Sequence, residues 1–273
     1  MKKRVYITGD THGEFDKIYN FLTYISEPSV IIVAGDFGGV WCVDEEDCPN
    51  NYTADFTNQR AYEEAKIDKL SEMLGENILM FVCGNHENFD RLYKYPEKEV
   101  FGGMTHEIRK NIFHMERAET FDIDGLKIFA FGGAFSHDIQ GGSIDMDNPN
   151  YIFALNRAYE SGLAFRIKNV SWWEAEKPSD EEIDKGYEVI NGKNFDYIVT
   201  HQTNMAVEEK IGIKYDGHFG YEFPDFLRAI DVLCNYKKWF FGHYHIDKEI
   251  DEKHRVIYDD FVELTKEGTR FVF

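Results

Sequence analysis

Five runs of apolar residues in this chain stop abruptly at small and polar residues. They cover residues 4–8, 29–34, 78–82, 195–200 and 237–241. Asp, Asn or His follows each run directly or after one or two intervening residues. Such a stop marks the carboxyl end of a buried strand, where open α/β sheets hold their ligands. If the five runs are neighbouring strands, we expect their terminal polar side chains to meet in one place.

The first third of the chain alternates strand and helix patterns. Apolar residues recur at helical spacing from Phe15 to Ile25, and a Glu-Pro pair stops that helix. Residues 30–34 are continuously apolar, as expected of a strand covered on both faces. Residues 4–35 therefore predict a βαβ unit with parallel strands. A helix over 59–74 and a strand over 78–83 extend the prediction to βαβαβ.

The second half of the chain predicts shorter strands and less regular structure. Strands are expected near 105–118, at 121–123, 127–131, 196–200 and 239–241, with closing strands at 255–258 and 269–273. A capping box at Ser179 and Glu182 predicts a helix to about residue 190, and further helices are expected at 151–160 and 224–234. We found no internal repeat or composition break. The expected organisation is one domain over 1–273 with an irregular insertion around 135–190.

The charge of the chain limits its partners. The formal net charge is −20, which argues against binding long nucleic acid, because polyanions are held by Lys and Arg. Phosphate substrates remain open, since bound cations can reverse the local field. An acidic, aperiodic stretch over 41–58 predicts a surface loop. That loop is either a solvated charge cluster or a border of the active cleft.

Cysteine usage and hydropathy favour a cytoplasmic protein. The four cysteines form no CxxC pair, which indicates reduced thiols. The apolar run near the amino terminus covers only residues 5–7 and is too short for a signal peptide. No stretch approaches the roughly 20 apolar residues of a spanning helix, so no membrane partner is expected.

The residues at the strand ends form a set of candidate metal ligands. In an extended segment residues i and i+2 point to the same side, so Asp10 and His12 can bind one ion, and His243 and His245 can do the same. Carboxylates, imidazoles and one amide without a thiolate favour Mn, Fe, Zn or Co over Ca or Mg. The set is too large for one tetrahedral ion, and two ions can stabilise both oxygens of a phosphoryl displacement. The seven candidates are Asp10, His12, Asp36, Asn85, His201, His243 and His245.

Five motifs in this order resemble those of the calcineurin-like metallophosphoesterase superfamily. They are GDTHG from Gly9, the dipeptide Gly35-Asp36, GNHE from Gly84, His201, and GHYH from Gly242. The motifs span residues 9–245, which is most of the chain. The resemblance implies an α/β fold, a four-layer α/β/β/α sandwich of two mixed β-sheets flanked by helices.

The resemblance also implies a dinuclear metal centre. Asp36 would be the carboxylate shared by two divalent or trivalent transition-metal ions. The first ion would take Asp10, His12 and His245, and the second would take Asn85, His201 and His243. Manganese is the metal expected in vitro, with Fe, Zn, Co and Ni as alternatives.

The implied activity is hydrolysis of a phosphomonoester or phosphodiester by a hydroxide held between the ions. His86 would not ligate but would face the substrate and protonate the leaving oxygen as general acid, while Glu87 would orient His86 or a nearby loop. The chain has GDFGG and CGNHE without the arginines of Ser/Thr phosphatases, so protein phosphatase activity is disfavoured. GGAFSHD, SWWEAEKPS and YDDFVEL resemble segments of small bacterial and phage-type metallophosphoesterases.

Several alternatives stay open at this point. The substrate is expected to be a small phosphate ester, with nucleotides as candidates. The competing functions are a metal-dependent nuclease and a non-catalytic metal-binding scaffold on the same fold. Substrate-pocket residues could include His137, Asp138 and His218, although loop residues of these types are usually solvated. Trp172 and Trp173 are either packing anchors or a base-stacking platform, and the candidate phosphate contacts are Arg91, Arg157 and Arg166.

Overall fold

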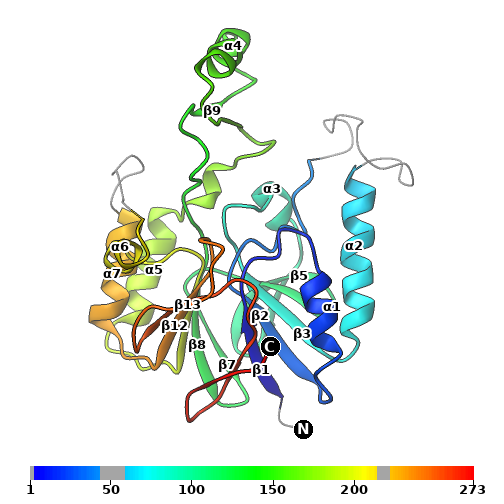
Figure 1. Cartoon of the computed structure of the whole chain (residues 1–273), viewed down its shortest axis with the longest axis vertical. Helices are drawn as coiled ribbons and strands as arrows, with labels where there is room; N and C mark the ends of the chain where they lie inside the picture. Colours follow the sequence, from blue (N-terminus) through cyan, green and yellow to red (C-terminus); the bar gives the residue numbers. More distant parts are fainter. Residues whose placement is uncertain (1–2, 44–58, 214–221) are drawn as a thin grey trace.

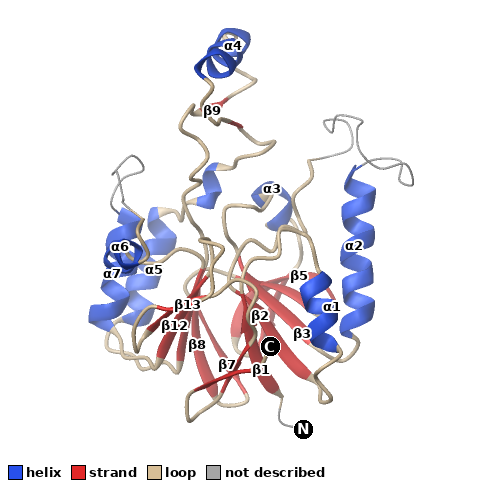
Figure 2. Cartoon of the chain, in the orientation of Figure 1, coloured by secondary structure: helices blue, strands red, loops and turns tan. Residues whose placement is uncertain are grey.

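Two β-sheets pack face to face, and helices cover their outer faces (Figure 1, Figure 2). The computed structural model of the chain describes residues 3–43, 59–213 and 222–273. The candidate His218 and residues 44–58 of the predicted acidic loop lie outside the described residues. The predicted four-layer α/β/β/α sandwich is confirmed.

The first sheet has eight strands, and its centre is parallel. Strands β1, β2, β3 and β6 run parallel, with Ile7 paired to Ile32 across β1 and β2. Antiparallel strands extend the sheet on both sides. The predicted βαβαβ unit is therefore confirmed. In sheet order the strands are β16 (Thr269–Phe271), β15 (Val262–Leu264), β1 (Arg4–Thr8), β2 (Ser29–Val33), β3 (Ile78–Val82), β6 (Ile112–Met115), β5 (Gly103–Arg109) and β4 (Glu97–Val100).

The second sheet has six strands, of which the central four are parallel. Strands β8, β11, β12 and β14 pair in parallel, and β7 and β13 close the edges in antiparallel pairing. The carboxyl ends of β11 and β12 therefore lie side by side. In sheet order the strands are β13 (Lys248–Glu249), β14 (His254–Val256), β12 (Lys238–Phe241), β11 (Tyr197–Thr200), β8 (Leu126–Phe131) and β7 (Glu119–Ile123).

Three apolar clusters hold the layers together. The central cluster joins the inner faces of both sheets, for example Ile32 and Met80 with Ile128 and Val199. A second cluster packs α1 (Asp16–Leu22) and α2 (Gln59–Leu74) on the first sheet. A third packs α5 (Asp180–Ile190) and α7 (Glu222–Leu233) on the second. Since burial of apolar area is the main favourable term in folding, these clusters fix the relative position of the strand ends.

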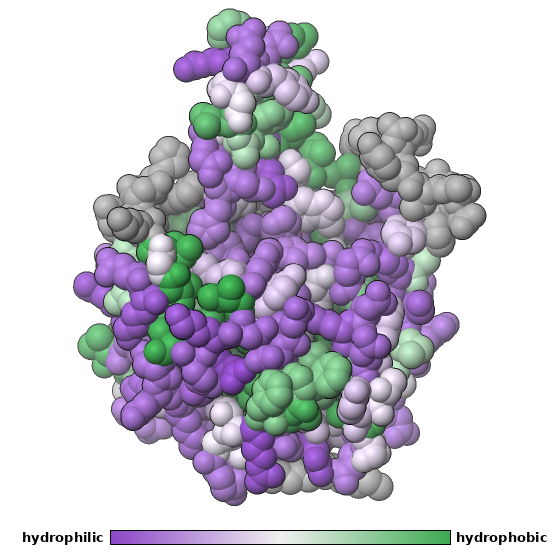
Figure 3. Space-filling model, viewed as in Figure 1, coloured by the Kyte–Doolittle hydropathy of each residue, from purple (hydrophilic) through white to green (hydrophobic). Residues whose placement is uncertain are grey.

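The segment with β9, α4 and β10, between β8 and α5, forms an arm that projects away from the sheets (Figure 1). It contains β9 (Ser143–Ile144), α4 (Tyr151–Ser161) and β10 (Arg166–Ile167), and β9 and β10 pair in parallel. The 3-10 helix η1 (Glu174–Glu176) returns the chain to the body. The predicted helix over 151–160 is confirmed as α4. The apolar side chains of Ile152 and Phe153 on α4 are exposed. Figure 3 shows hydrophobic residues at the surface of the arm.

The structure contains two short helices that the sequence pattern did not predict. The helices α3 (Phe89–Leu92) and α6 (Met205–Lys210) have no clear periodicity in the sequence. Each is capped by an asparagine, Asn88 and Asn204, whose side chain accepts a backbone N–H of the first turn. The capping box at Ser179 and Glu182 is confirmed. In the described parts of the chain, no helix combines the length and apolar character that a bilayer span requires.

Candidate metal centre

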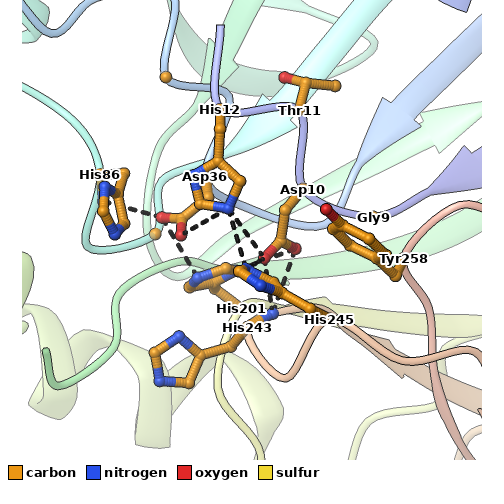
Figure 4. A network of polar contacts seen from close by, with 12 residues as sticks. Gly9, Asp10, Thr11, His12, Asp36, His86, His201, His243, His245 and Tyr258 are labelled. Atoms are coloured by element: carbon orange, nitrogen blue, oxygen red, sulfur yellow. Dashed lines mark hydrogen bonds and ion pairs between the residues drawn. The ribbon is translucent and has the colours of Figure 1, made fainter. Parts of the chain in front are cut away.

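Six of the seven candidate ligands converge where the loops after β1, β2, β11 and β12 meet, and the loop after β3 brings His86 to them (Figure 4). These loops leave the carboxyl ends of strands from both sheets, so the site lies at the common edge of the two sheets. Figure 4 shows the imidazoles of His12, His201 and His245 directed toward the carboxylates of Asp10 and Asp36. The structure thus brings together residues that are up to 235 positions apart in the sequence (245 minus 10).

One group of possible ligands consists of Asp10, His12 and His245. Their ligand atoms all lie within 4.8 Å of one another. His245 Nε2 lies 3.3 Å from Asp10 Oδ2, and His12 Nε2 lies 2.9 Å from His245 Nε2. Two facing imidazole nitrogens can share one proton, or both can offer lone pairs to one cation. This arrangement matches the set expected for the first ion.

A second group consists of Asp36, His201 and His243, and all three are buried. The Nδ1 of His201 lies 2.8 Å from the carbonyl oxygen of Ala34, to which it donates. This bond leaves Nε2 of His201 directed at Asp36 Oδ1 at 3.3 Å. Burial alone would lower the pKa of His201, but the carboxylates of Asp36 and Asp10 raise it to about 10. The two carboxylates therefore create a strongly negative field at the His201 ring, and the same field would attract a metal cation.

Three buried atoms in this region fit a cation directly. Asn85 Oδ1, His201 Nε2 and His243 Nε2 are buried and have no hydrogen-bond partner among the residues that the structure describes. Buried polar atoms are normally paired, so these three atoms call for an explanation, although His201 Nε2 also lies 3.3 Å from Asp36 Oδ1. An amide oxygen and two imidazole nitrogens are ordinary ligands of Mn, Fe, Zn or Co. The donor set therefore fits the second ion.

Four of the ligand positions have a left-handed backbone. The φ angles of His12, Asp36, His243 and His245 are 49°, 45°, 72° and 50°. Such conformations cost of order 1–3 kcal/mol each and cluster at functional sites. They also correct one expectation, because His243 and His245 are not extended and do not face one site. His245 joins Asp10 and His12, whereas His243 joins Asp36 and His201.

The glycines that precede the ligands leave room for side chains from other loops to approach the backbone closely. A Cβ atom on Gly35 would lie 2.0 Å from His201 Nδ1, and one on Gly242 would lie 2.1 Å from Asp10 Oδ1. Any larger residue would therefore push a ligand out of place. This close approach explains the Gly-Asp and Gly-His dipeptides in physical terms.

His86 lies at the edge of both groups. Its backbone N–H donates to Asp36 Oδ1 at 2.8 Å, and its ligand atom lies within 4.8 Å of those of His12 and Asp36. Burial lowers the pKa of the His86 imidazole, and the carboxylate of Asp36 opposes that shift. One face of the ring stacks on Trp41 at a centroid distance of 5.2 Å. The ring is therefore held in one orientation beside the ligands.

Glu87 stabilises the loops of the site rather than the His86 ring. It is fully buried and accepts the backbone N–H groups of Gly84 at 2.7 Å and Gly38 at 3.3 Å. Burial and the nearby charge of Asp36 raise the pKa of Glu87 to about 8. This result selects the loop-orienting alternative of its predicted role.

A cavity of about 280 Å³ opens beside His12 and His86. Its walls include Trp41, Lys66 and Glu14. Lys66 Nζ lies 2.8 Å from Glu14 Oε1, so a cation and an anion both line the cavity. Trp41 also packs edge-on against Trp173 at 5.3 Å, which fixes the indole. The sequence placed Trp41 only in an acidic loop, and no motif marked it as part of a site.

The other predicted substrate contacts lie in different parts of the structure, and only some of them are near the metal centre. The His137 ring stacks on His243 at 4.4 Å, so His137 lies beside the second group. Asp138 accepts two hydrogen bonds from Arg166, one of them at 2.9 Å from Nε. Arg91 is 5% exposed and binds Glu63 and Glu64, so its predicted phosphate contact is wrong and it anchors α2 instead. Arg157 is exposed on α4, on the arm.

Trp172 and Trp173 are 9% and 2% exposed, which favours the packing alternative. Trp173 Nε1 donates to Asp90 at 3.2 Å. His106 and His114 are also buried, and their Nδ1 atoms lie 3.1 Å apart. These residues stabilise the fold around the site.

The sequence matches a family model and several curated proteins. The family model described as Calcineurin-like phosphoesterase matches residues 3–247. The lariat debranching enzyme of Danio rerio is 26% identical over 151 residues, which are 52% of this chain and 24% of that protein. The enzyme of Caenorhabditis briggsae is 25% identical over 62% of this chain and 31% of its own length. The human enzyme is 28% identical over 52% of this chain and 25% of its own length.

The match to these curated relatives spans a third of their length or less. A solved structure of a Staphylococcus aureus protein described as a 5′-nucleotidase aligns with 98% of this chain and 52% of its own. The identity is 13% and the TM-score is 0.43.

Proposed function

The chain belongs to the calcineurin-like phosphoesterase family, and on that premise we propose that it is a two-metal-dependent hydrolase of a small phosphate ester. The observation that carries the proposal is the clustering of the buried His201 and His243 with Asp36, together with the buried Asn85 Oδ1, which has no hydrogen-bond partner among the described residues. Buried polar atoms without a partner are unfavourable unless a ligand such as a metal ion binds them. The competing scaffold function requires the ligands but no proton donor such as His86.

The ligands are proposed to divide between two ions. Asp10, His12 and His245 would hold the first ion, and Asn85, His201 and His243 would hold the second, with Asp36 shared. When bound, the two ions supply Lewis acidity that activates water and neutralises charge on the phosphoryl group. Manganese is the proposed metal in vitro, and the neutral imidazole and amide ligands also suit Fe, Zn, Co and Ni.

His86 is proposed to donate a proton to the leaving oxygen. Burial lowers the pKa of His86, so the protonated ring is a stronger acid but makes up a smaller fraction of the protein at neutral pH. The stack on Trp41 and the backbone bond to Asp36 hold the ring beside the ligands at a fixed angle. Arg166, fixed by its two bonds to Asp138, is the cationic side chain proposed to contact the phosphate.

The cavity beside His86 is proposed to receive the leaving group. Its aromatic wall, Trp41, and its charged wall, Lys66 and Glu14, suit a nucleoside or another planar polar group. The net charge of −20 favours a small substrate over a long polynucleotide. The matched relatives are lariat debranching enzymes, so a lariat substrate belongs in the panel that tests the nuclease alternative. A cytoplasmic location stays a prediction.

The decisive variant is Asp36→Asn, which keeps the shape of the side chain and removes the shared charge. With Mn²⁺, we expect its kcat/KM on an aryl phosphate ester to fall by about 100-fold or more, since even outer-shell changes cost 10–100-fold. Asp147→Asn, an exposed residue on the arm, is the matched control for loss of one carboxylate. Unchanged hydrolysis by Asp36→Asn would refute the shared-ligand role. Absence of turnover by the Mn-loaded wild type on nucleotides, cyclic nucleotides, dinucleoside polyphosphates, sugar phosphates and a lariat would favour the scaffold.

A further inference from the structure

We propose that Ser136 and Glu176 form a relay that positions the Asn85 amide for the second metal ion. This inference rests on the proposed function, because it concerns an ion of the proposed centre. Neither residue is a ligand, and both are therefore positioning residues. Glu176 belongs to the SWWEAEKPS segment, and Ser136 belongs to the GGAFSHD segment. The relay gives both segments a role.

Three hydrogen bonds connect Glu176 to Asn85. Ser136 donates through its backbone N–H to Glu176 Oε1 at 3.0 Å and through its hydroxyl to Glu176 Oε2 at 2.6 Å. The Ser136 hydroxyl oxygen in turn accepts the Asn85 Nδ2 group at 3.4 Å. Because an amide has its donor and its acceptor on opposite sides, this bond directs Asn85 Oδ1 away from Ser136. That oxygen is the buried atom without a partner among the described residues.

The carboxylate of Glu176 is buried without a direct counter-ion. Glu176 is 0% exposed, and among the described residues no Lys, Arg or His nitrogen lies within salt-bridge distance of it. The nearest guanidinium, that of Arg117, binds the carbonyl oxygens of Ala175 and Glu176 instead of the carboxylate. A buried charge without a partner is costly, and burial accordingly raises the pKa of Glu176 to about 7. An ion held by Asn85 would supply the missing positive charge through two hydrogen-bonded residues.

The relay is rigid because its two segments are tied to the end of β3. Gly133 donates its backbone N–H to the carbonyl of Cys83 at 2.7 Å, two residues before Asn85. Ala134 donates to the carbonyl of Glu176 at 3.2 Å. The side chain of Ser136 is therefore fixed on both sides, and the Asn85 amide cannot rotate without breaking a bond. Outer-shell partners of this kind typically change metal affinity by about 10- to 100-fold when removed.

Titration of the metal-free protein with Mn²⁺ tests the relay. The readouts are the number of bound ions, the Kd of each, and the electron paramagnetic resonance signal that separates coupled from single Mn²⁺. We expect Ser136→Ala to weaken the second ion by about 10- to 100-fold and to leave the first ion unchanged. Glu176→Gln retains an acceptor for Ser136 and should weaken the second ion less than Glu176→Ala. Glu174→Gln is the matched control, because Glu174 lies in the same turn with an exposed side chain.

The outcomes of these titrations either support or refute the Ser136–Glu176 relay. Thermal unfolding of the metal-free variants checks that they fold, and Ser136→Ala decides alone if Glu176→Ala does not. Equal affinity of Ser136→Ala and wild type for the second ion would overturn the relay, whereas a hydrolytically active, two-ion wild type would leave the proposed function intact. A wild type that binds fewer than two Mn²⁺ ions would overturn both.

Discussion

Replacement of Trp41 with leucine tests whether the cavity beside His86 binds the leaving group. The indole lines that cavity, stacks on His86 and packs against Trp173. Stacking of a base on an aromatic side chain contributes about 1–3 kcal/mol. At 1.36 kcal/mol for each factor of ten, this corresponds to a loss of about 5- to 150-fold in kcat/KM for a nucleotide.

The assay compares two substrates with the same reacting group. A nucleoside monophosphate carries a base that can stack on the indole, whereas glycerol phosphate carries none. Trp41→Leu should reduce kcat/KM strongly for the nucleotide and much less for glycerol phosphate, and Trp41→Phe should restore part of the difference. Phe153→Leu, an exposed aromatic residue on the arm, is the control. Thermal unfolding monitors the lost contact with Trp173, which is worth about 0.5–1.5 kcal/mol.

Two results would refute this reasoning. An equal loss for both substrates would mean that Trp41 acts through the orientation of His86 and not through a bound base. No loss for either substrate would mean that the leaving group lies outside the cavity. In the second case His137, whose ring stacks on His243, would be the next residue to test.

Three further predictions concern stability and the shape of the site. Burial, with smaller contributions from His106 and Arg117, keeps the pKa of His114 well below its usual value. Unfolded His114 protonates near pH 6.5, so the free energy of unfolding should fall as the pH drops below that value, by up to about 1.4 kcal/mol per unit. Urea unfolding of His114→Phe between pH 7.5 and 5 should show a shallower pH slope, and equal slopes would contradict the assignment. Ser179→Ala removes a capping box and should cost about 1 kcal/mol in urea unfolding, with Ser161→Ala as control. Gly242→Ala should reduce Mn²⁺ affinity, because its Cβ would lie 2.1 Å from Asp10 Oδ1, and wild-type affinity would contradict that crowding.

The positions of the ligands could be predicted because a buried strand that stops at Asp, Asn or His is a local pattern. His201 directly follows β11, and Asp10 and Asp36 follow β1 and β2 after one and two residues. A second local argument, that residues i and i+2 face one side, held for Asp10 and His12 but failed for His243 and His245, and it assumed an extended backbone where His12, His243 and His245 are left-handed. Left-handed conformations are imposed by packing of the loop, and the pattern of residue types does not reveal them.

The surroundings of the ligands could not be predicted, because they depend on contacts between distant segments. Trp41, which lines the cavity, packs against Trp173, and Glu176 accepts hydrogen bonds from Ser136, 40 positions earlier in the chain. Arg91 was a candidate for phosphate binding, but Glu63 and Glu64 on α2 engage it. A single sequence gives the identity of such side chains and not their partners.

The sequence by itself predicted the alternation of strands and helices and the candidate ligand types, because these are properties of short segments, whereas the four layers and the division of the ligands were implied by the family resemblance. The tertiary structure alone decided which buried atoms of the described residues remain without hydrogen-bond partners and where the cavity opens. The physical reason is that these features arise from close packing of five loops at one edge of two sheets. A displacement of about 1 Å there decides whether a donor, a carboxylate or a cation can fit.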